Sequence, residues 1–365
     1  MRIWLVPSAY APRTGGIETV TRSLGLALAR AGHEITVLTH QDPLDALPFE
    51  RLDGLDVHRL RWGIPRANPH HIAAYLRDVR RSTHALRGLP VPDVINVHGA
   101  SNQMIPLGRF ARAARVPFVL ATHGEVVADP RQMFQRSTFM RVTLRRTCTS
   151  ASALVAPSRW TCESAGRVAT AFRAATVIPN GIDADRFRVG PPPVTPTFAA
   201  YGRHEHQKGY DLLVRAWPLV RRQVPEARLL LAGAGSETER LRALASDGVD
   251  FLGALSGSGV LDILRSARVV VVPSRVEAFG MTALEALAAG RALVHSGRGG
   301  LPEATGGLGI VADPEDPEAL ATAMVNALAP DPPDAREHLR ALSWDMIAAR
   351  YLSVYEQILP TPTVA

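Results

Sequence analysis

Short apolar runs alternate with amphipathic segments from the first residues of the chain. RIWLV is followed by a helical pattern over about 17–31 and then by EITVLT. Later apolar runs read DVINVHG, FVLATHG, ALVAPS and TVIPNG. Strands that alternate with helices in this way predict βαβ units around a parallel sheet.

The same alternation begins again after a proline-rich stretch, GPPPVTP, at 190–196. The second series of apolar runs reads TFAAYG, ARLLLAGAG, VDFLGAL, RVVVVPS, ALVHSG and GIVAD. A proline-rich break between two such series marks a domain boundary. We therefore predict two doubly wound α/β domains, the first over 1–187 and the second over 188–344.

The segment SWDMIAARYLSVYEQIL near the carboxyl end has apolar residues at the spacing of one helix face. They are Trp344, Ile347, Tyr351, Val354, Tyr355 and Ile358. This spacing predicts a helix over about 345–360, which can pack on either domain.

Composition adds limits on location and chemistry. The amino terminus lacks the charged start and long apolar run of a signal peptide, and no apolar run approaches the ~20 residues of a membrane span. Cys148 and Cys162 are too few for a disulfide framework and are not spaced as a metal site. These features favour a cytoplasmic protein.

The net charge of +7 is unevenly distributed. Residues 1–190 hold 25 arginines against 14 acids, and residues 191–365 hold 16 cations against 20 acids. A basic half attracts nucleic acid, an anionic membrane or an anionic substrate, although arginines on solvated helix faces explain it equally well. Aromatic residues at 6% give a nucleic-acid module little support.

The membrane alternative has one candidate segment, RQMFQRSTFMRVTLRR at 131–146. It mixes basic and apolar residues as an amphipathic helix on an anionic bilayer does. A packed helix with snorkelling arginines has the same composition. Both interpretations stay open from the sequence.

Ligands of open α/β sheets bind beyond the carboxyl ends of the strands, so the strand-to-loop junctions hold the candidate chemistry. At the first junction Gly15 and Gly16 precede a helix, where paired glycines let backbone N–H groups approach an anion. At YGRHEHQKGYDLL, Arg203 and Lys208 lie on one loop, as a diphosphate site requires. Of the 41 lysines and arginines, only Lys208 is a lysine, which favours a specific need for an ammonium group.

The junction VVVVPSRVEAFGMTALEALAAG combines an apolar strand, a loop with Glu277 and a helix that begins after Gly280 and carries Glu285. A helix amino end is an anion site, and the two carboxylates can accept hydrogen bonds from sugar hydroxyls. His98 and His123 each lie beside a glycine at the end of a strand. No histidine or cysteine spacing predicts a zinc site, and we expect no metal.

Together these motifs resemble glycosyltransferase family 4, the retaining enzymes of the GT-B fold. The resemblance covers nearly the whole chain. It rests on GGIETVTRSLGLALARAGHEITVLT, VAPSRWT, VIPNGIDADRF, GRHEHQKGYDLLVRAW, LLLAGAG, VDFLG and EAFGMTALEALAAGRALV. It implies two Rossmann-like domains facing a cleft, with the carboxyl-terminal helix crossing back onto the first domain.

The resemblance also implies roles for individual residues. Arg203 and Lys208 would hold the diphosphate of a nucleotide sugar, Glu277 the donor sugar and Glu285 the ribose. His123 matches the family's histidine near the reacting sugar, which ranks it above His98, a candidate for the acceptor. The remaining residues of the expected donor site are Gly15, Gly16, Gly233, Leu255, Phe279, Gly280, Met281 and Thr282.

The reaction suggested is transfer of a hexosyl or N-acetylhexosaminyl group to an acceptor hydroxyl, without a cofactor. Fixed cations and a helix end suit the negative charge that grows on the leaving diphosphate. A UDP-sugar is the favoured donor, and a small metabolite or glycoconjugate is the favoured acceptor. A GDP-mannose-type donor with a lipid-linked acceptor and a GT-B epimerase or phosphorylase are the alternatives.

Overall fold

The computed structural model describes residues 1–12, 15–41, 46–62, 69–128, 133–255, 257–329 and 331–360, apart from the side chains at 69–72, 74 and 128. The chain forms two compact units. Unit 1 comprises Met1–Gly181 with Trp344–Ala365, and unit 2 comprises Ile182–Ser343. The chain thus passes between units at 181/182 and 343/344, where the sequence analysis placed the boundaries at 187/188 and 344/345.

Unit 1 is built on a sheet of eight strands in the order β3-β4-β2-β1-β5-β6-β7-β8. The strands are β1 (Arg2–Pro7), β2 (Glu34–His40), β3 (Phe49–Leu52), β4 (Leu55–Leu60), β5 (Val94–His98), β6 (Phe118–Ala121), β7 (Ala153–Ala156) and β8 (Thr176–Val177). All neighbours pair in parallel except β3 and β4, which are antiparallel. The predicted parallel sheet is confirmed, and the β3–β4 hairpin was not predicted.

Helices cover both faces of this sheet. They are α1 (Gly16–Arg30), α2 (Pro69–Arg87), α3 (Met104–Ala114), α4 (Glu125–Ala128), α5 (Met133–Arg136), α6 (Thr138–Ser150), α7 (Arg159–Gly166), η1 (Thr170–Ala174) and α15 (Trp344–Ile358). Trp4 of β1 shares a buried cluster with Phe110 of α3 and Leu144 of α6. Leu5, on the opposite face, contacts α1 near Gly25.

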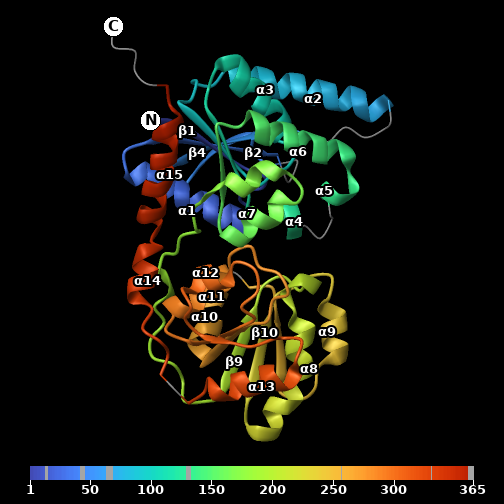
Figure 1. Cartoon of the computed structure of the whole chain (residues 1–365), viewed down its shortest axis with the longest axis vertical. Coiled ribbons are helices and arrows are strands. Elements are labelled where there is room, and N and C mark those ends of the chain that lie inside the picture. The colour runs from blue at the N-terminus through green and yellow to red at the C-terminus, as the bar shows by residue number, and fades with distance from the viewer. Residues whose placement is uncertain are drawn as a thin grey trace. The chain divides into compact units, whose positions relative to one another are not determined.

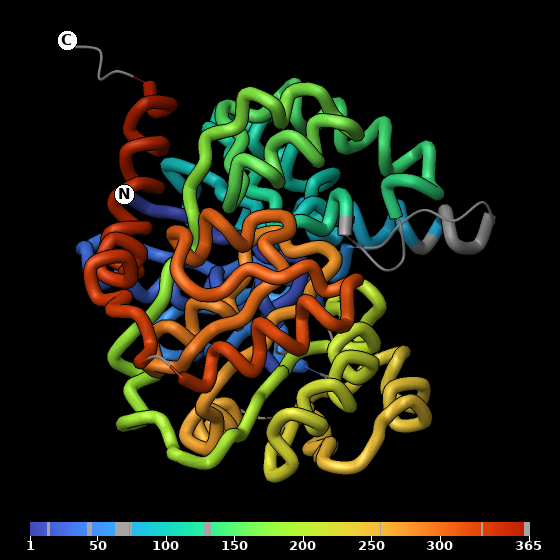
Figure 2. The backbone as a smooth tube through the Cα atoms, turned by 60° about the horizontal axis from the view of Figure 1, so that its bottom comes forward, coloured from blue at the N-terminus to red at the C-terminus, as the bar shows by residue number. Residues whose placement is uncertain are grey.

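Helix α15 packs on α1, and the two lie side by side in Figures 1 and 2. Its buried residues are Trp344, Ile347, Ala348, Tyr351, Val354 and Tyr355. The return of the carboxyl-terminal helix to the first unit is therefore confirmed. Arg30 and Asp345 add an exposed ion pair of 2.7 Å between the two helices.

The segment 131–146 does not form one amphipathic helix. Two helices, α5 and α6, replace it, and the break falls at Ser137. Its hydroxyl accepts a hydrogen bond from the Met140 backbone N–H at 3.3 Å, so the serine caps α6 instead of continuing α5. Arg131 lies outside the described residues.

Unit 2 is built on a fully parallel sheet of six strands in the order β11-β10-β9-β12-β13-β14. The strands are β9 (Thr197–Tyr201), β10 (Arg228–Ala232), β11 (Val249–Gly253), β12 (Val269–Val272), β13 (Ala292–His295) and β14 (Ile310–Val311). Each coincides with a predicted apolar run.

The helices of unit 2 follow its strands along the chain. They are η2 (Asp185–Phe187), η3 (His206–Lys208), α8 (Tyr210–Gln223), α9 (Thr238–Leu244), α10 (Gly257–Ser266), α11 (Met281–Ala288), α12 (Leu301–Thr305), α13 (Pro317–Asn326) and α14 (Arg336–Ala341). Phe198 of β9 and Trp217 of α8 meet edge to face in the core, with ring centroids 5.7 Å apart. Within the described ranges of both units, none of the helices has the length and apolar character needed to cross a bilayer.

Candidate functional site

The loops that follow β9, β10 and β12 come together at the carboxyl edge of the second sheet. A Cβ on Gly209, whose φ is +69°, would lie 2.1 Å from the carbonyl oxygen of Pro273. A Cβ on Gly233, whose φ is +134°, would lie 1.8 Å from the carbonyl oxygen of Gly202. Only glycine fits at these two positions, so the sequence builds the close contact between the loops.

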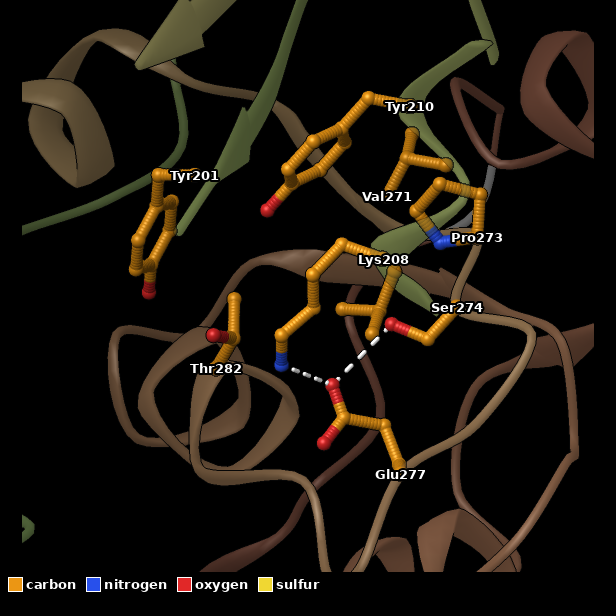
Figure 3. Close-up of a pocket in the computed structure, with 9 residues that line it drawn as sticks. Tyr201, Lys208, Tyr210, Val271, Pro273, Ser274, Glu277 and Thr282 are labelled. Carbon is orange, nitrogen blue, oxygen red and sulfur yellow. Dashed lines mark hydrogen bonds and ion pairs between the residues drawn. The ribbon is translucent and has the colours of Figure 1, made fainter. Parts of the chain in front are cut away.

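A small hollow opens where these loops meet, with a volume of about 10 Å³, enough for about one water molecule. Figure 3 shows Lys208, from the loop after β9, and Ser274 and Glu277, both from the loop after β12, converging on it. Its lining residues are Tyr201, Lys208, Tyr210, Val271, Val272, Pro273, Ser274, Glu277 and Thr282. The structure therefore brings together three predicted site residues, Lys208 from one loop with Glu277 and Thr282, of which Glu277 lies 69 residues further along the chain.

Two donors hold one oxygen of the Glu277 carboxylate. Lys208 Nζ lies 2.5 Å from Glu277 Oε1, and the Ser274 hydroxyl donates to the same oxygen at 3.0 Å. The exposed fractions of the Lys208 and Glu277 side chains are 23% and 11%. Glu277 Oε2 accepts no hydrogen bond from the described residues, so it remains able to accept one from a hydroxyl group.

Glu285 of α11 also has one carboxylate oxygen that accepts a hydrogen bond and one that accepts none among the described residues. The Tyr201 hydroxyl donates to its Oε2 at 2.9 Å, and Oε1 accepts nothing from the part of the chain that the structure describes. Burial raises the pKa of Glu285 to about 7, although the Tyr201 hydrogen bond and the positive charges of Arg186 and Lys208 oppose that shift. The carboxyl group thus titrates near neutrality.

Gly280 is the N-cap of α11 and has a φ of +123°, which residues with a side chain rarely adopt. Phe279, the residue before it, is buried. The loop is braced by a hydrogen bond of 2.8 Å from the Gly300 N–H to the Glu277 carbonyl. The predicted helix start after Gly280 is present, and Met281 and Thr282 form its first turn. The first-turn N–H groups of a helix have no partner within the helix and can meet an anion.

The other predicted donor residues of unit 2 lie outside the hollow. Arg203 is exposed, and among the described residues its side chain makes no hydrogen bond or ion pair. Gly233 follows β10, and the half-buried Leu255 lies between β11 and α10.

In unit 1, the structure places the two predicted histidines in contact. His98 Nδ1 lies 3.0 Å from His123 Nε2, and the rings stack with centroids 5.2 Å apart. Beneath them, the Glu125 carboxylate accepts hydrogen bonds from the backbone N–H groups of Ala100 and His123, each at 2.7 Å. Glu125 therefore ties together the loops that follow β5 and β6.

Gly15 and Gly16 lie at the amino end of α1, as predicted. Gly15 is the N-cap, and a Cβ there would lie 2.5 Å from a carboxylate oxygen of Glu18. A Cβ on Gly16 would meet none of the described residues within 4 Å.

Several residues of the site carried no signal in the sequence. Ser274, Tyr201 and Glu125 are ordinary residues until the fold sets them against Glu277, Glu285 and the histidine loops. No group of three histidine, cysteine, aspartate or glutamate residues within the described ranges is arranged to hold a metal ion. Both cysteines are buried and neither forms a disulfide, and burial raises the pKa of Cys148 to about 12.

Two family models match the chain. One described as Glycosyltransferase Family 4 matches residues 14–186, and one described as Glycosyl transferases group 1 matches residues 195–330. Each covers most of one unit.

Curated relatives and solved structures match over nearly the full length. Glycogen synthase of Mycobacterium tuberculosis is 30% identical over 97% of this chain and 94% of the relative. The GDP-mannose-dependent alpha-(1-6)-phosphatidylinositol monomannoside mannosyltransferase of Mycolicibacterium smegmatis is 30% identical over 89% of this chain and 88% of the relative. The structure of sucrose-phosphate synthase from Thermosynechococcus elongatus superimposes with a TM-score of 0.73, at 26% identity and 98% coverage of both chains.

Proposed function

The chain belongs to glycosyltransferase family 4 with the GT-B fold, and on that premise we propose that it transfers a hexosyl or N-acetylhexosaminyl group from a nucleotide sugar to an acceptor hydroxyl with retention of configuration. The observation that supports this proposal best is the Lys208–Ser274–Glu277 cluster. It sets a cation for a diphosphate beside a carboxylate with one oxygen open to a sugar hydroxyl.

The residues divide the work between binding and charge stabilisation. Glu285 accepts hydrogen bonds from the ribose hydroxyls, while Glu277 and the first turn of α11 hold the donor sugar. Lys208 and Arg203 stabilise the charge on the leaving diphosphate. His123 of the first unit meets the donor sugar, as the family resemblance implies.

In the proposed reaction, the bond between the anomeric carbon and the phosphate oxygen breaks, and its electron pair stays on that oxygen. The acceptor hydroxyl forms the new bond from the same face and passes its proton to the departing phosphate. This front-face route needs no strong protein base. The roles of Lys208 and Glu277 in it are electrostatic and positional.

The proposal also names a sugar nucleotide and an acceptor. A UDP-sugar is the first donor to test, with a small metabolite or glycoconjugate as acceptor. GDP-mannose is the second donor to test, together with a lipid-linked acceptor. The mannosyltransferase of Mycolicibacterium smegmatis depends on GDP-mannose.

A donor panel tests the proposal directly. Thermal shift is measured with UDP-glucose, UDP-galactose, UDP-N-acetylglucosamine and GDP-mannose, because a ligand at 100 times its Kd adds about 2.7 kcal/mol to stability. The stabilising donor is then incubated with a panel of alkyl glycosides and polyols, and proton NMR gives the configuration of the product. Transfer with inversion overturns the front-face route, and epimerisation without transfer assigns the chain to the alternative class.

A basic hollow on unit 1 supports a second candidate, an acceptor presented at an anionic membrane. The hollow lies between α3 and α6, has a volume of about 360 Å³ and is lined by Arg112, Arg145, Arg146, Thr149 and Ser150. Neither α3 nor α6 contains an acid. Phe139 and Val142 of α6 are 46% and 38% exposed, so apolar and basic side chains share the accessible surface of that helix.

Vesicle co-sedimentation at low and high salt tests this candidate. Each basic residue near an anionic surface contributes about 1 kcal/mol, so replacing Arg112, Arg145 and Arg146 with glutamine should weaken binding on the order of a hundredfold. Replacing Arg240, Arg242 and Arg265 of unit 2 changes the net charge equally and is the matched control. If the wild-type protein ignores phosphatidylglycerol vesicles at low salt, or if both triple variants lose binding equally, this surface has no such role.

A further inference from the structure

The pairing of His98 with His123 constrains where the protons of both rings lie. His98 is fully buried at the end of β5, and His123 follows β6. The 3.0 Å contact joins His98 Nδ1 to His123 Nε2, so one of these nitrogens carries a proton and the other is bare. Each ring also has an outer nitrogen, His98 Nε2 and His123 Nδ1, without a hydrogen-bond partner among the described residues.

Both rings are neutral at physiological pH. Burial lowers the pKa of His123 to about 4, and burial together with His123 lowers the pKa of His98 well below its usual value. A neutral imidazole carries one proton. The proton positions of the two rings are therefore linked, and only two arrangements are consistent with the hydrogen bond.

In the first arrangement, His98 donates from Nδ1 and keeps a bare Nε2 in the core, while His123 carries its proton on Nδ1. In the second, His123 donates from Nε2, and His98 must keep an unpaired N–H on Nε2. The surroundings of His98 decide between the two. Its ring lies against Tyr351 of α15, with centroids 5.8 Å apart, in a fully buried position.

Each arrangement leaves one N–H without a partner among the described residues, on His123 Nδ1 in the first and on His98 Nε2 in the second. His98 is fully buried whereas His123 is half-buried, so a ligand oxygen can reach the unpaired N–H more readily on His123, which favours the first arrangement. We propose that His98 is a positioning residue that holds His123 as its Nδ1–H tautomer, so that His123 presents a hydrogen-bond donor to an oxygen of the bound donor sugar. The hydrogen bond made by one ring nitrogen sets the state of the other. The role of His123 toward the sugar rests on the proposed function, whereas the tautomer itself does not.

The tautomer matters because histidine in water favours the proton on Nε2. Without His98, His123 would revert to that form and present a bare Nδ1, an acceptor, to the sugar. A hydroxyl can adapt by rotating, but an oxygen that gains negative charge in the transition state cannot accept from a bare nitrogen. The loss should therefore fall on kcat more than on the KM for the donor.

Nitrogen-15 NMR of the full-length protein, labelled at histidine, reads the tautomer without any substrate. Long-range proton–nitrogen spectra at pH 7.5 distinguish protonated from bare ring nitrogens, and His123→Gln assigns the signals. We expect His123 to carry its proton on Nδ1 in the wild type and on Nε2 in His98→Leu. His98→Asn places an amide near the position of the imidazole Nδ1 and should restore the wild-type tautomer.

Kinetics follow on the same variants. His98→Leu should lower kcat roughly tenfold, the effect of one hydrogen bond, while His98→Asn should stay close to the wild type. A bare His123 Nδ1 in the wild type overturns the inference even if His98→Leu does not fold. An unchanged His123 tautomer in a folded His98→Leu also overturns it. Failure of the proposed function has a different result, in which the tautomers behave as expected but no donor is turned over.

Discussion

Replacing Lys208 with alanine removes the cation that faces the buried oxygen of Glu277. The expectation from the sequence alone is a loss of turnover with little loss of stability, because a loop cation rarely supports a core. The structure changes that expectation, since Lys208 and Glu277 are paired at 2.5 Å with side chains only 23% and 11% exposed. The variant leaves a poorly solvated carboxylate with Ser274 as its only hydrogen-bond donor among the described residues.

The magnitude follows from this partial burial. Removing one partner of a fully buried pair costs about 3 to 5 kcal/mol, and exposed pairs contribute about 0 to 1 kcal/mol. We expect Lys208→Ala to lower the free energy of unfolding by about 2 kcal/mol, between those limits. Adding Glu277→Gln removes the unpaired charge and keeps an acceptor for Ser274, so the double variant should recover at least half of that loss.

Turnover should respond differently. Loss of one well-placed electrostatic contact to the leaving group raises the barrier by about 2 to 4 kcal/mol, so kcat should fall on the order of 10² to 10³ in Lys208→Ala. The double variant should remain equally slow, because it still lacks the Lys208 ammonium group at the diphosphate. Lys208→Arg keeps the charge and should be as stable as the wild type within about 1 kcal/mol, yet slower, because a planar fork replaces a compact ammonium group.

Urea unfolding of the four proteins measures stability, with a constant m-value as the check that two-state behaviour is unchanged. Release of nucleoside diphosphate measures turnover. A double variant as unstable as Lys208→Ala would show that the stranded carboxylate is not the cause of the instability. Near-normal kcat in Lys208→Ala would remove the proposed role at the diphosphate.

Three further outcomes follow from the same geometry. Arg203→Ala should lower kcat but change the free energy of unfolding by no more than about 0.5 kcal/mol, because Arg203 is exposed and unpaired among the described residues. Urea unfolding and kinetics check this, and a large loss of stability would contradict it. Calorimetry should show that Glu285→Ala weakens binding of both free nucleotide and intact donor while Glu277→Ala spares the free nucleotide, and equal losses would refute the assignment. Burial raises the pKa of Glu285 to about 7, so nucleotide affinity should rise about tenfold from pH 6 to pH 8 as the carboxylate forms. If affinity changes as little with pH in the wild type as in Glu285→Gln, that ionisation has no role in binding.

The fold could be predicted where the strands are buried. Strands such as β12, VVVV, are apolar throughout because helices cover both faces of a parallel sheet. The β3–β4 hairpin escaped prediction because it is an edge element with mixed polarity. Its burial alternates between exposed and half-buried along FERL, and the turn falls at Asp53 and Gly54, both with positive φ. Edge strands carry a weaker apolar signal than central ones.

The site could be predicted as a set of residues but not as a set of contacts. Strand-end position and residue type were enough to select Lys208 and Glu277. Their pairing joins residues 69 apart in sequence, and it depends on how closely the loops after β9 and β12 approach. The contact of His98 with His123 likewise depends on the neighbouring places of β5 and β6 in the sheet. A single sequence contains no direct record of such distances.

The geometry around Glu277 also gives a reason for the single lysine in an arginine-rich chain. An ammonium group has three donors that radiate from one nitrogen, so Lys208 can hold Glu277 Oε1 and still offer two donors to phosphate oxygens. A guanidinium group presents its donors in a fixed plane and pairs best with a whole carboxylate edge. An arginine at 208 would therefore engage both oxygens of Glu277 and occupy Oε2, the oxygen left for the sugar. Lysine can therefore bind one oxygen of the carboxylate and leave Oε2 available to the sugar.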